Sequence, residues 1–292
     1  MTAAADLRRL MADTGILPMA GVFDALSGML AEQAGLPLAY VSGYCVSATR
    51  LGRPDVGYLG LSELVETARR IADRVGIPVI ADGDDGYGNH LNTARLVREL
   101  EAAGIAGVQL EDQVSPKRCG HMAGKRVVPA GEMVAKIKAA ADTRRDDDFL
   151  IIARTDAIAV TGFEDALERG AAYAEAGADA IFLEAPETVD QCRAIPPAFD
   201  RPTVFNWAWG GKSPLLTRDE LAAMGFRFLQ CPDTVFAVTR ALLDVYGEVK
   251  RSGTYLALRD RMTDFDEFNA VVGLDEVSAL DARYRAIAEG RE

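Results

Sequence analysis

Residues 78–112 read PVIADGDDGYGNHLNTARLVRELEAAGIAGVQLED, and this stretch decides the fold. Short apolar runs at 78–84 and 107–112 flank a segment at 91–103 whose apolar residues recur with helical spacing. A buried strand, a helix and a second buried strand predict one βαβ unit of a parallel sheet. Both strands end in acidic residues, Asp82 and Asp84 in the first and Glu111 in the second.

The same alternation of strand and helix continues along most of the chain. Strands are predicted at 21–24, 38–42, 78–84, 107–112, 149–156, 180–185, 203–207 and 226–231, and helices at 61–75, 91–103, 131–141, 163–176 and 234–246. Eight βα units in roughly 230 residues predict an α/β fold, the TIM (β/α)8 barrel. A doubly wound open sheet is the alternative, but the first βα turn lacks a Gly-x-Gly-x-x-Gly fingerprint.

The chain is expected to be one barrel domain over 1–292, with the barrel at about 19–248 and a helical extension at about 249–292. The extension is charged and has helical patterns at 256–262, 264–271 and 280–288, without a further strand. We expect these helices to contact another subunit, and a surface extension of the barrel is the alternative.

Composition limits the classes of partner and the compartment. The 292 residues are 49% hydrophobic and carry a net charge of −12, which argues against a nucleic acid or an anionic membrane as partner. Four widely spaced cysteines without a CxxC pattern predict neither a disulfide framework nor a structural zinc site. No apolar run reaches the ~18 residues of a membrane span, so we expect a protein of the reducing cytoplasm.

A basic segment containing cysteine, Lys117-Arg118-Cys119-Gly120-His121, follows the fourth predicted strand. Cationic neighbours favour a thiolate or a readily exchanged thiol proton, so Cys119 is a candidate for acid–base chemistry. The alternative is a solvated basic turn with an incidental cysteine.

Polar residues stand at the carboxyl ends of nearly all predicted strands, where TIM barrels carry their chemistry. Asp82, Asp84 and Glu111 come from neighbouring strands, and such oxygen ligands suit Mg²⁺, with Mn²⁺ as a second possibility. Asp and Gly also dominate ordinary turns, so an Asp-rich turn without metal is the alternative.

Two further strand ends suit an anionic substrate. Arg154 offers a fork of donors for a carboxylate, and Ser42 with the amides of Gly43 and Tyr44 could bind another. A buried ion pair between Arg154 and Glu184 is the competing explanation of that arginine. The expected partner is a small organic acid.

With these motifs assembled, the chain resembles the isocitrate lyase and phosphoenolpyruvate mutase superfamily, most closely its 2-methylisocitrate lyase-type and carboxyvinyl-carboxyphosphonate phosphorylmutase-like members. The resemblance runs from about residue 21 to about residue 273 and rests above all on Lys-Arg-Cys-Gly-His. It implies a TIM barrel whose terminal helix is exchanged between subunits, generally in a homotetramer built as a dimer of dimers.

The resemblance also implies roles for individual residues. The catalytic residues would be Cys119, Lys117, His121, Arg154 and Glu184; the metal-associated acids Asp82, Asp84 and Glu111; and the substrate-binding residues Ser42, Gly43, Tyr44, Asp55, Gly120, Arg154 and Asn206. The implied reaction is a Mg²⁺-dependent retro-aldol cleavage of a 2-hydroxy dicarboxylate to an α-keto acid and a carboxylic acid, with Cys119 as proton donor.

The chain departs from the tricarboxylate-specific members of the superfamily around the seventh and eighth strands. Trp207 and Trp209, the only tryptophans, follow Asn206, and Gln230-Cys231-Pro232 stand where an arginine for a third carboxylate is expected. If the tryptophans wall an apolar pocket, the substrate is a malate with an alkyl or aryl substituent. The alternative is ordinary packing of both tryptophans at the barrel rim.

Three other functions remain open from the sequence. Oxaloacetate decarboxylation or hydrolysis, and phosphonate mutase chemistry, use the same superfamily scaffold, although the lyase pentapeptide argues against a mutase. A non-catalytic barrel that binds a keto acid is the alternative from another class.

Overall fold

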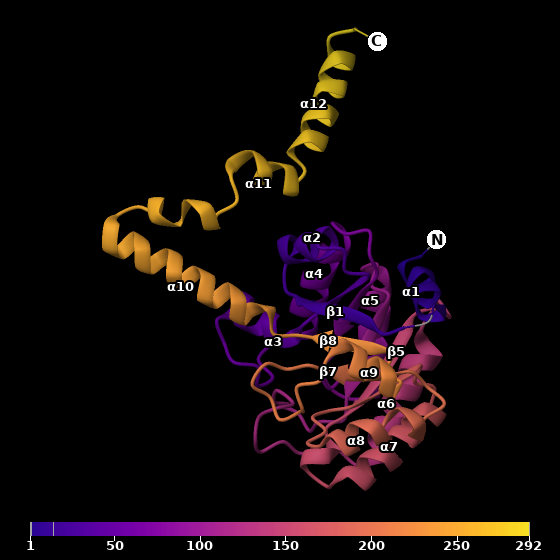
Figure 1. The fold of residues 1–292 in the computed structure, drawn as a ribbon. Coiled ribbons are helices and arrows are strands. Elements are labelled where there is room, and N and C mark those ends of the chain that lie inside the picture. Colours follow the sequence, from indigo (N-terminus) through magenta and orange to yellow (C-terminus); the bar gives the residue numbers. More distant parts are fainter. Residues whose placement is uncertain (1, 14, 292) are drawn as a thin grey trace. The chain divides into compact units, whose positions relative to one another are not determined.

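The computed structural model describes residues 2–13 and 15–291, in which eight parallel strands close into a barrel, each paired with the next and the last with the first (Figure 1). The predicted TIM barrel is confirmed. The strands are β1 (Leu17–Val22), β2 (Leu38–Val41), β3 (Val79–Asp82), β4 (Gly107–Glu111), β5 (Leu150–Thr155), β6 (Ala180–Leu183), β7 (Thr203–Asn206) and β8 (Phe228–Cys231).

Helices follow the strands and form the outer layer. They are α2 (Ala25–Gln33), α3 (Gly43–Val46), η1 (Ser47–Leu51), α4 (Leu61–Ala72), α5 (His90–Ala102), α6 (Ala130–Thr143), η2 (Ala157–Ala159), α7 (Phe163–Glu175), α8 (Val189–Ala194), η3 (Pro196–Ala198) and α9 (Arg218–Met224). After β8 the chain continues into α10 (Thr234–Ser252). A further helix, α1 (Ala3–Ala12), precedes the barrel. The predicted helices did not include α2, α3 or α8, which contain too few turns for a clear period.

The first strand lies earlier than predicted. We expected it at 21–24, but β1 starts at Leu17, and Met19 is in register with Leu38 on one side and Gln230 on the other. Asp24 lies outside the strand and caps α2, where its Oδ1 accepts a hydrogen bond from the Ser27 amide at 2.7 Å. Asp24 is therefore a helix-capping residue and no part of the polar strand ends.

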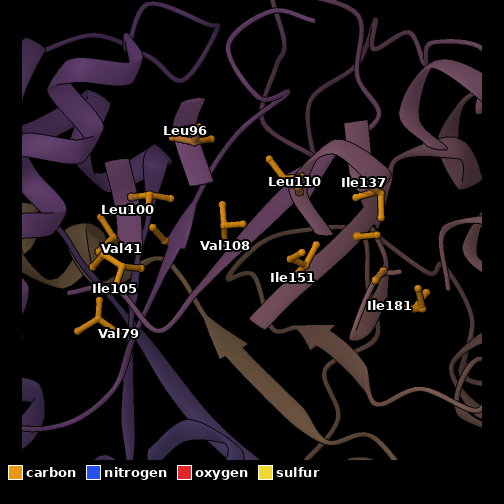
Figure 2. Packing of buried hydrophobic residues seen from close by; sticks show 14 of the residues in the cluster. Val41, Val79, Leu96, Leu100, Ile105, Val108, Leu110, Ile137, Ile151 and Ile181 are labelled. Carbon is orange, nitrogen blue, oxygen red and sulfur yellow. The ribbon is translucent and has the colours of Figure 1, made fainter. Parts of the chain in front are cut away.

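Two apolar layers hold the barrel together. The inner cluster fills the barrel with side chains such as Tyr40, Ile152 and Phe182, and Leu7 of α1 packs against it. The outer cluster lies between the strands and the helices, where Leu96 and Leu100 of α5 and Ile137 of α6 meet strand residues (Figure 2). Burial of this apolar surface is the main favourable term for the fold.

Alternation along each strand decides which side chains reach the interior of the barrel. In β5, Leu150 and Ile152 belong to the inner cluster, whereas Ile151 and Ala153 belong to the outer one. Arg154 continues the inward series at the carboxyl end of the strand. On five other strands, too, the residue two positions after an inner-cluster residue is polar and is expected to face inward. These residues are Ser42, Asp82, Glu184, Asn206 and Gln230.

The chain divides into two units, residues 1–235 and 236–292. The second unit contains most of α10, followed by η4 (Leu256–Arg261), α11 (Phe265–Val271) and α12 (Leu274–Ala288). Helix α11 begins with a capping box in which Asp264 and Glu267 bond each other's amides. No helix among the described residues is both long and apolar enough to cross a membrane.

Candidate active site

The floor of the site is a buried cluster of charges around Arg154 at the carboxyl ends of the strands. Its guanidinium lies 3.2 Å from Glu111 Oε2, 2.9 Å from Asp156 Oδ2 and 3.1 Å from Glu184 Oε2. Arg154 is 7% exposed and also lies over the Phe182 ring. The ion pair between Arg154 and Glu184 is therefore present, and it positions the guanidinium at the wall of a cavity.

Asp82 and Glu111 come to the same floor from neighbouring strands. Asp82 Oδ2 accepts a hydrogen bond from the Gly43 amide at 3.3 Å, and its side chain lines the cavity. Glu111 Oε1 is buried without a hydrogen-bond partner among the described residues. Burial raises the pKa of Glu111 well above its usual value, even beside Arg154. A cation bound here would relieve this unfavourable burial of a carboxylate.

Asp84 pairs with the basic segment that follows β4. Its Oδ1 lies 2.6 Å from Lys117 Nζ, which also lies 2.6 Å from Asp55 Oδ1. Burial raises the pKa of Asp84 to about 7, whereas Asp84 and Asp55 together raise the pKa of Lys117. Asp84 is therefore an ion-pair partner of Lys117, and its Oδ1 stands beside Asp82 Oδ2 at Gly43. The assignment of Asp82, Asp84 and Glu111 to a metal ion stays a prediction.

The fit of this site to Mg²⁺ rests on few protein ligands. The part of the chain that the structure describes contains no group of three His, Cys, Asp or Glu side chains placed to hold a metal ion between them. Mg²⁺ commonly binds through one or two carboxylates and completes its octahedron with water and substrate oxygens. Asp82 beside the cavity and the unpartnered Glu111 oxygen fit that mode of binding.

The segment 117–125 packs down onto the floor and forms one side of the rim. The Cys119 amide donates to the Asp55 carbonyl at 3.1 Å, and the Gln113 side chain bonds both the amide and the carbonyl of Arg118. Lys125 Nζ donates to the Gly120 carbonyl and to Asp156 Oδ1, the latter at 2.7 Å. A Cβ at Gly120 would overlap Arg154 and Glu184, so glycine is what allows this close approach.

Cys119 lines the cavity, but its surroundings differ from the sequence prediction. The side chain of Lys117 pairs with carboxylates, and Arg118 is exposed. Burial raises the pKa of the Cys119 thiol to about 11, and the nearby Asp55 and Glu184 charges act in the same direction. Of the two states that the sequence favoured, a thiolate or a thiol with an exchangeable proton, this raised pKa supports the thiol that can deliver a proton.

His121 is held by contacts on both ring nitrogens. Nδ1 accepts a hydrogen bond from the Lys212 amide at 3.1 Å, and Nε2 lies 3.4 Å from Glu184 Oε1. The amide donor assigns the proton of a neutral ring to Nε2. His121 thus joins the segment 117–125 to the segment 207–212 and lines the cavity between them.

The predicted carboxylate-binding turn lies at the start of α3. Ser42 Oγ accepts from the Cys45 amide at 3.3 Å, and the Gly43 amide points to Asp82. Asn206 donates to both oxygens of Glu184 at 3.2 Å, which leaves its buried Oδ1 without a partner among the residues described. Ser42, Tyr44 and Asn206 line the cavity, whereas Gly43 does not, and its amide is bound to Asp82.

Together these groups surround a small cavity of about 40 Å³. The predicted residues that line it are Ser42, Tyr44, Asp55, Asp82, Lys117, Cys119, Gly120, His121, Arg154, Glu184 and Asn206. Gly43, Asp84, Glu111, Trp207 and Trp209 are not part of its lining. The strand ends and the basic segment are thus brought together as the sequence predicted.

The prediction that two tryptophans wall the cavity is wrong for this structure. Trp207 has the outward register, packs against the outer cluster and donates from Nε1 to the Leu216 carbonyl at 3.0 Å. Trp209 is 66% exposed and lies 5.9 Å from the Trp207 ring. Ala208 between them is the residue whose side chain lines the cavity.

Several residues of the site escaped the sequence reading. Gln230 and Asp233 line the cavity, and Lys125 ties Gly120 to Asp156. Lys125 and Arg154 hold the pKa of Asp156 at about 2, against the effect of burial. Gln230 could have been found from its spacing of two after the inner-cluster Phe228, but nothing local in the sequence marks Lys125 as buried.

Comparison with known proteins agrees with this geometry. The model of the phosphoenolpyruvate phosphomutase family matches residues 7–249. The chain belongs to this family. It is 43% identical over 285 residues to the 2,3-dimethylmalate lyase of Eubacterium barkeri, a match that covers 97% of this chain and 99% of that enzyme. It is 46% identical over 281 residues to the chloroplastic carboxyvinyl-carboxyphosphonate phosphorylmutase of Arabidopsis thaliana, covering 94% and 83%.

Solved structures give the same assignment for the phosphomutase family fold. A 2,3-dimethylmalate lyase of the PEP mutase/isocitrate lyase superfamily superposes with a TM-score of 0.92 at 33% identity, covering 97% of this chain and 96% of the other. An oxaloacetate acetylhydrolase with a bound inhibitor superposes with a TM-score of 0.90 at 35% identity, covering 100% and 98%. The resemblance seen in the sequence is confirmed, and the protein is a carbon–carbon lyase of this superfamily.

Proposed function

We propose that the protein is a Mg²⁺-dependent lyase that cleaves an alkyl-substituted malate to an α-keto acid and a carboxylic acid. The observation that carries this proposal is the position of Cys119 in the wall of the cavity, together with the buried ion pair of Arg154 and Glu184. The 43% identity to a 2,3-dimethylmalate lyase supports the class of substrate.

The residues divide the work between binding and proton transfer. Arg154 and Ser42 would hold the carboxylate of the 2-hydroxy acid end, and Asn206 offers its unpartnered Oδ1 to the hydroxyl group. Asp82 and Glu111 would hold Mg²⁺, which when bound supplies positive charge beside the forming keto group. Lys117 keeps Asp55 and Asp84 in place through two 2.6 Å contacts.

The groups in the cavity can account for each proton and for the electron pair of the bond that breaks. The hydroxyl proton passes to a carboxylate of the site, the C2–C3 bond breaks, and its electrons remain on C3 as an enolate-like carboxylate. The Cys119 thiol then protonates C3, and the proton taken from the hydroxyl restores the thiol. Because burial raises the pKa of Cys119 to about 11, the thiol keeps this proton until the carbon becomes basic.

A second candidate reaction is hydrolysis of oxaloacetate. The likeness to an oxaloacetate acetylhydrolase over the whole chain, at a TM-score of 0.90, favours it. Both reactions break a bond between two carbons of a dicarboxylate, so the same floor would serve either one.

The test is a release assay with Mg²⁺ over 2,3-dimethylmalate, 2-methylisocitrate, oxaloacetate and phosphonopyruvate. Keto acids are measured by a coupled dehydrogenase, and oxalate and acetate by NMR. We expect the highest kcat/KM with the substituted malate, at least about tenfold above the tricarboxylate. A highest value with oxaloacetate or the phosphonate would reject the lyase assignment. Binding of pyruvate without release from any substrate would identify a binding protein.

We also propose that the second unit, 236–292, exchanges helices between subunits in a homotetramer. Its helices expose large apolar side chains, among them Leu243, Phe265 and Val277, which are 61%, 81% and 60% exposed. Clusters of this kind on a soluble chain mark protein contacts. Light scattering should give the mass of four chains, and a chain that ends at residue 253 should lose it.

A further inference from the structure

Asp233 is the one carboxylate on the rim of the cavity that the proposed mechanism does not use. It follows β8 and Pro232, and its side chain lines the cavity. The Pro232 carbonyl accepts the Cys45 thiol at 3.0 Å and packs so tightly on Gly21 that a Cβ there would overlap it. The backbone beside Asp233 is therefore fixed against β1 and α3.

The Asp233 carboxylate is also fixed in direction. Its Oδ2 accepts a hydrogen bond from the Trp209 amide at 2.7 Å, so it is joined to the segment 207–212. Burial raises its pKa, while the Trp209 amide and the nearby His121 favour the ionised form. Asp233 also acts electrostatically on Tyr44, whose pKa is raised by burial and by neighbouring acidic groups that include Asp233.

Positive charge that could balance a further anion near Asp233 is scarce. The basic residues that line the cavity are Lys117, Arg118, His121 and Arg154. Lys117 is paired with two carboxylates and Arg154 with three, and the Arg118 side chain is exposed. If a substrate has its first two carboxylates on the floor, a third carboxylate that reaches the rim would lie near Asp233.

We propose that Asp233 is a specificity-determining residue, which repels a third carboxylate and so restricts the site to malates with uncharged substituents. This inference rests on the proposed function and deepens it. Three observations support the inference: the 2.7 Å hydrogen bond from the Trp209 amide, the place of Asp233 in the cavity wall, and the ion pairs that the floor cations already form with carboxylates. Like charges opposed in a site of low dielectric discriminate strongly between ligands.

The first test compares two substrates in Asp233→Asn. Asparagine keeps an oxygen for the Trp209 amide but loses the charge. The ratio of kcat/KM for 2-methylisocitrate to that for 2,3-dimethylmalate should rise by about tenfold or more. Asp147→Asn makes the same change of net charge at an exposed position before β5, and it should leave the ratio within about twofold of the parent. A ratio unchanged in Asp233→Asn overturns the inference.

A binding measurement separates this inference from the proposed reaction. Calorimetry with Mg²⁺ gives Kd for succinate and for tricarballylate, which differ by one carboxymethyl group. Their Kd ratio should shift by about tenfold toward the tricarboxylate in Asp233→Asn and return to the parental ratio in Asp233→Glu. If no substrate is cleaved but this shift occurs, the inference stands and the proposed function fails. If malates are cleaved and the ratio stays within twofold, the inference fails alone.

Discussion

The floor and the rim of the cavity are held in place by different means. On the floor, Arg154 and its three carboxylates stand at strand ends and are almost fully buried. On the rim, Cys119 and His121 belong to loop segments, which a few side-chain bonds such as Lys125 to Gly120 hold down. The floor geometry therefore follows from the barrel itself, whereas the rim geometry depends on single residues. Floor substitutions should cost stability and activity, and rim substitutions mainly activity.

The largest effect is expected for Arg154→Met on the floor. It leaves Glu111 and Glu184 buried without their cation and Asp156 with Lys125 alone, which should lower the free energy of unfolding by about 3–5 kcal/mol and abolish turnover. Denaturant unfolding and the release assay measure both. Arg98→Met, at an exposed position of α5, is the control and should change neither. A variant with parental stability would show that the floor is not held by its charges.

Cys119→Ser on the rim should lower kcat by about 10³-fold, because a hydroxyl is a much weaker acid than a thiol. The free energy of unfolding and the Kd of succinate should stay near the parental values, in contrast to Arg154→Met. Cys192→Ser in α8 is the cysteine control and should keep parental turnover. Full activity of Cys119→Ser would remove the cysteine from proton transfer.

The raised pKa of Cys119 predicts how kcat and the alkylation of this cysteine depend on pH. A proton donor acts below its pKa, so a thiol with a pKa of about 11 stays competent up to that pH, well above the range of an ordinary thiol. We expect no alkaline loss of kcat from Cys119 between pH 7 and 10. Alkylation of Cys119 by iodoacetamide at pH 8 should be slower than that of a free cysteine, as measured by mass spectrometry. Rapid alkylation would indicate the thiolate.

Lys125→Met tests the connection between rim and floor. It removes the donor to the Gly120 carbonyl and one partner of Asp156. We expect kcat/KM to fall by about 10²-fold through misplacement of Cys119, and the free energy of unfolding to fall by about 1–3 kcal/mol. Lys138→Met on the exposed face of α6 should have neither effect. If the variant stayed active while segment 117–125 was disordered, the proposal that activity depends on the position of the rim would be wrong.

The smallest effect separates two neighbours on the rim. Ala208→Leu fills part of the cavity and should shift kcat/KM by about tenfold toward malates with smaller substituents. Trp209→Ser should leave that preference within about twofold, because the Trp209 side chain does not line the cavity. The opposite result would place the substituent against the tryptophan.

Much of the floor could be predicted from strand periodicity. Arg154, Glu184 and Asn206 lie two residues beyond inward-facing Ile152, Phe182 and Val204. The same rule explains why other polar strand ends lie elsewhere. Asp112, one residue out of phase, bonds Thr155 at 2.7 Å and Tyr173 at 2.8 Å outside the cavity. The prediction from the sequence did not separate strand-end residues that face the barrel interior from those, such as Asp112, that face outward.

The rim could not be predicted in this way, because its contacts join segments far apart in the chain. Nothing near Lys117 in the sequence shows that its cation meets Asp55 and Asp84 rather than the Cys119 thiol. The tryptophan pocket failed for a related reason. The order Trp207-Ala208-Trp209 drew attention to the large side chains, although the smallest one faces the cavity.

The sequence by itself determined the barrel, its eight strands and the family, because periodic apolar residues and one rare pentapeptide are local signals. It also determined which acids could gather at one end of the sheet. Only the tertiary structure decided the burial of Cys119, the partner of Asp84 and the place of Asp233. Each of these depends on burial and on charged groups that the fold brings together from distant parts of the chain. Neither burial nor the distance between two side chains can be read from their positions in the sequence.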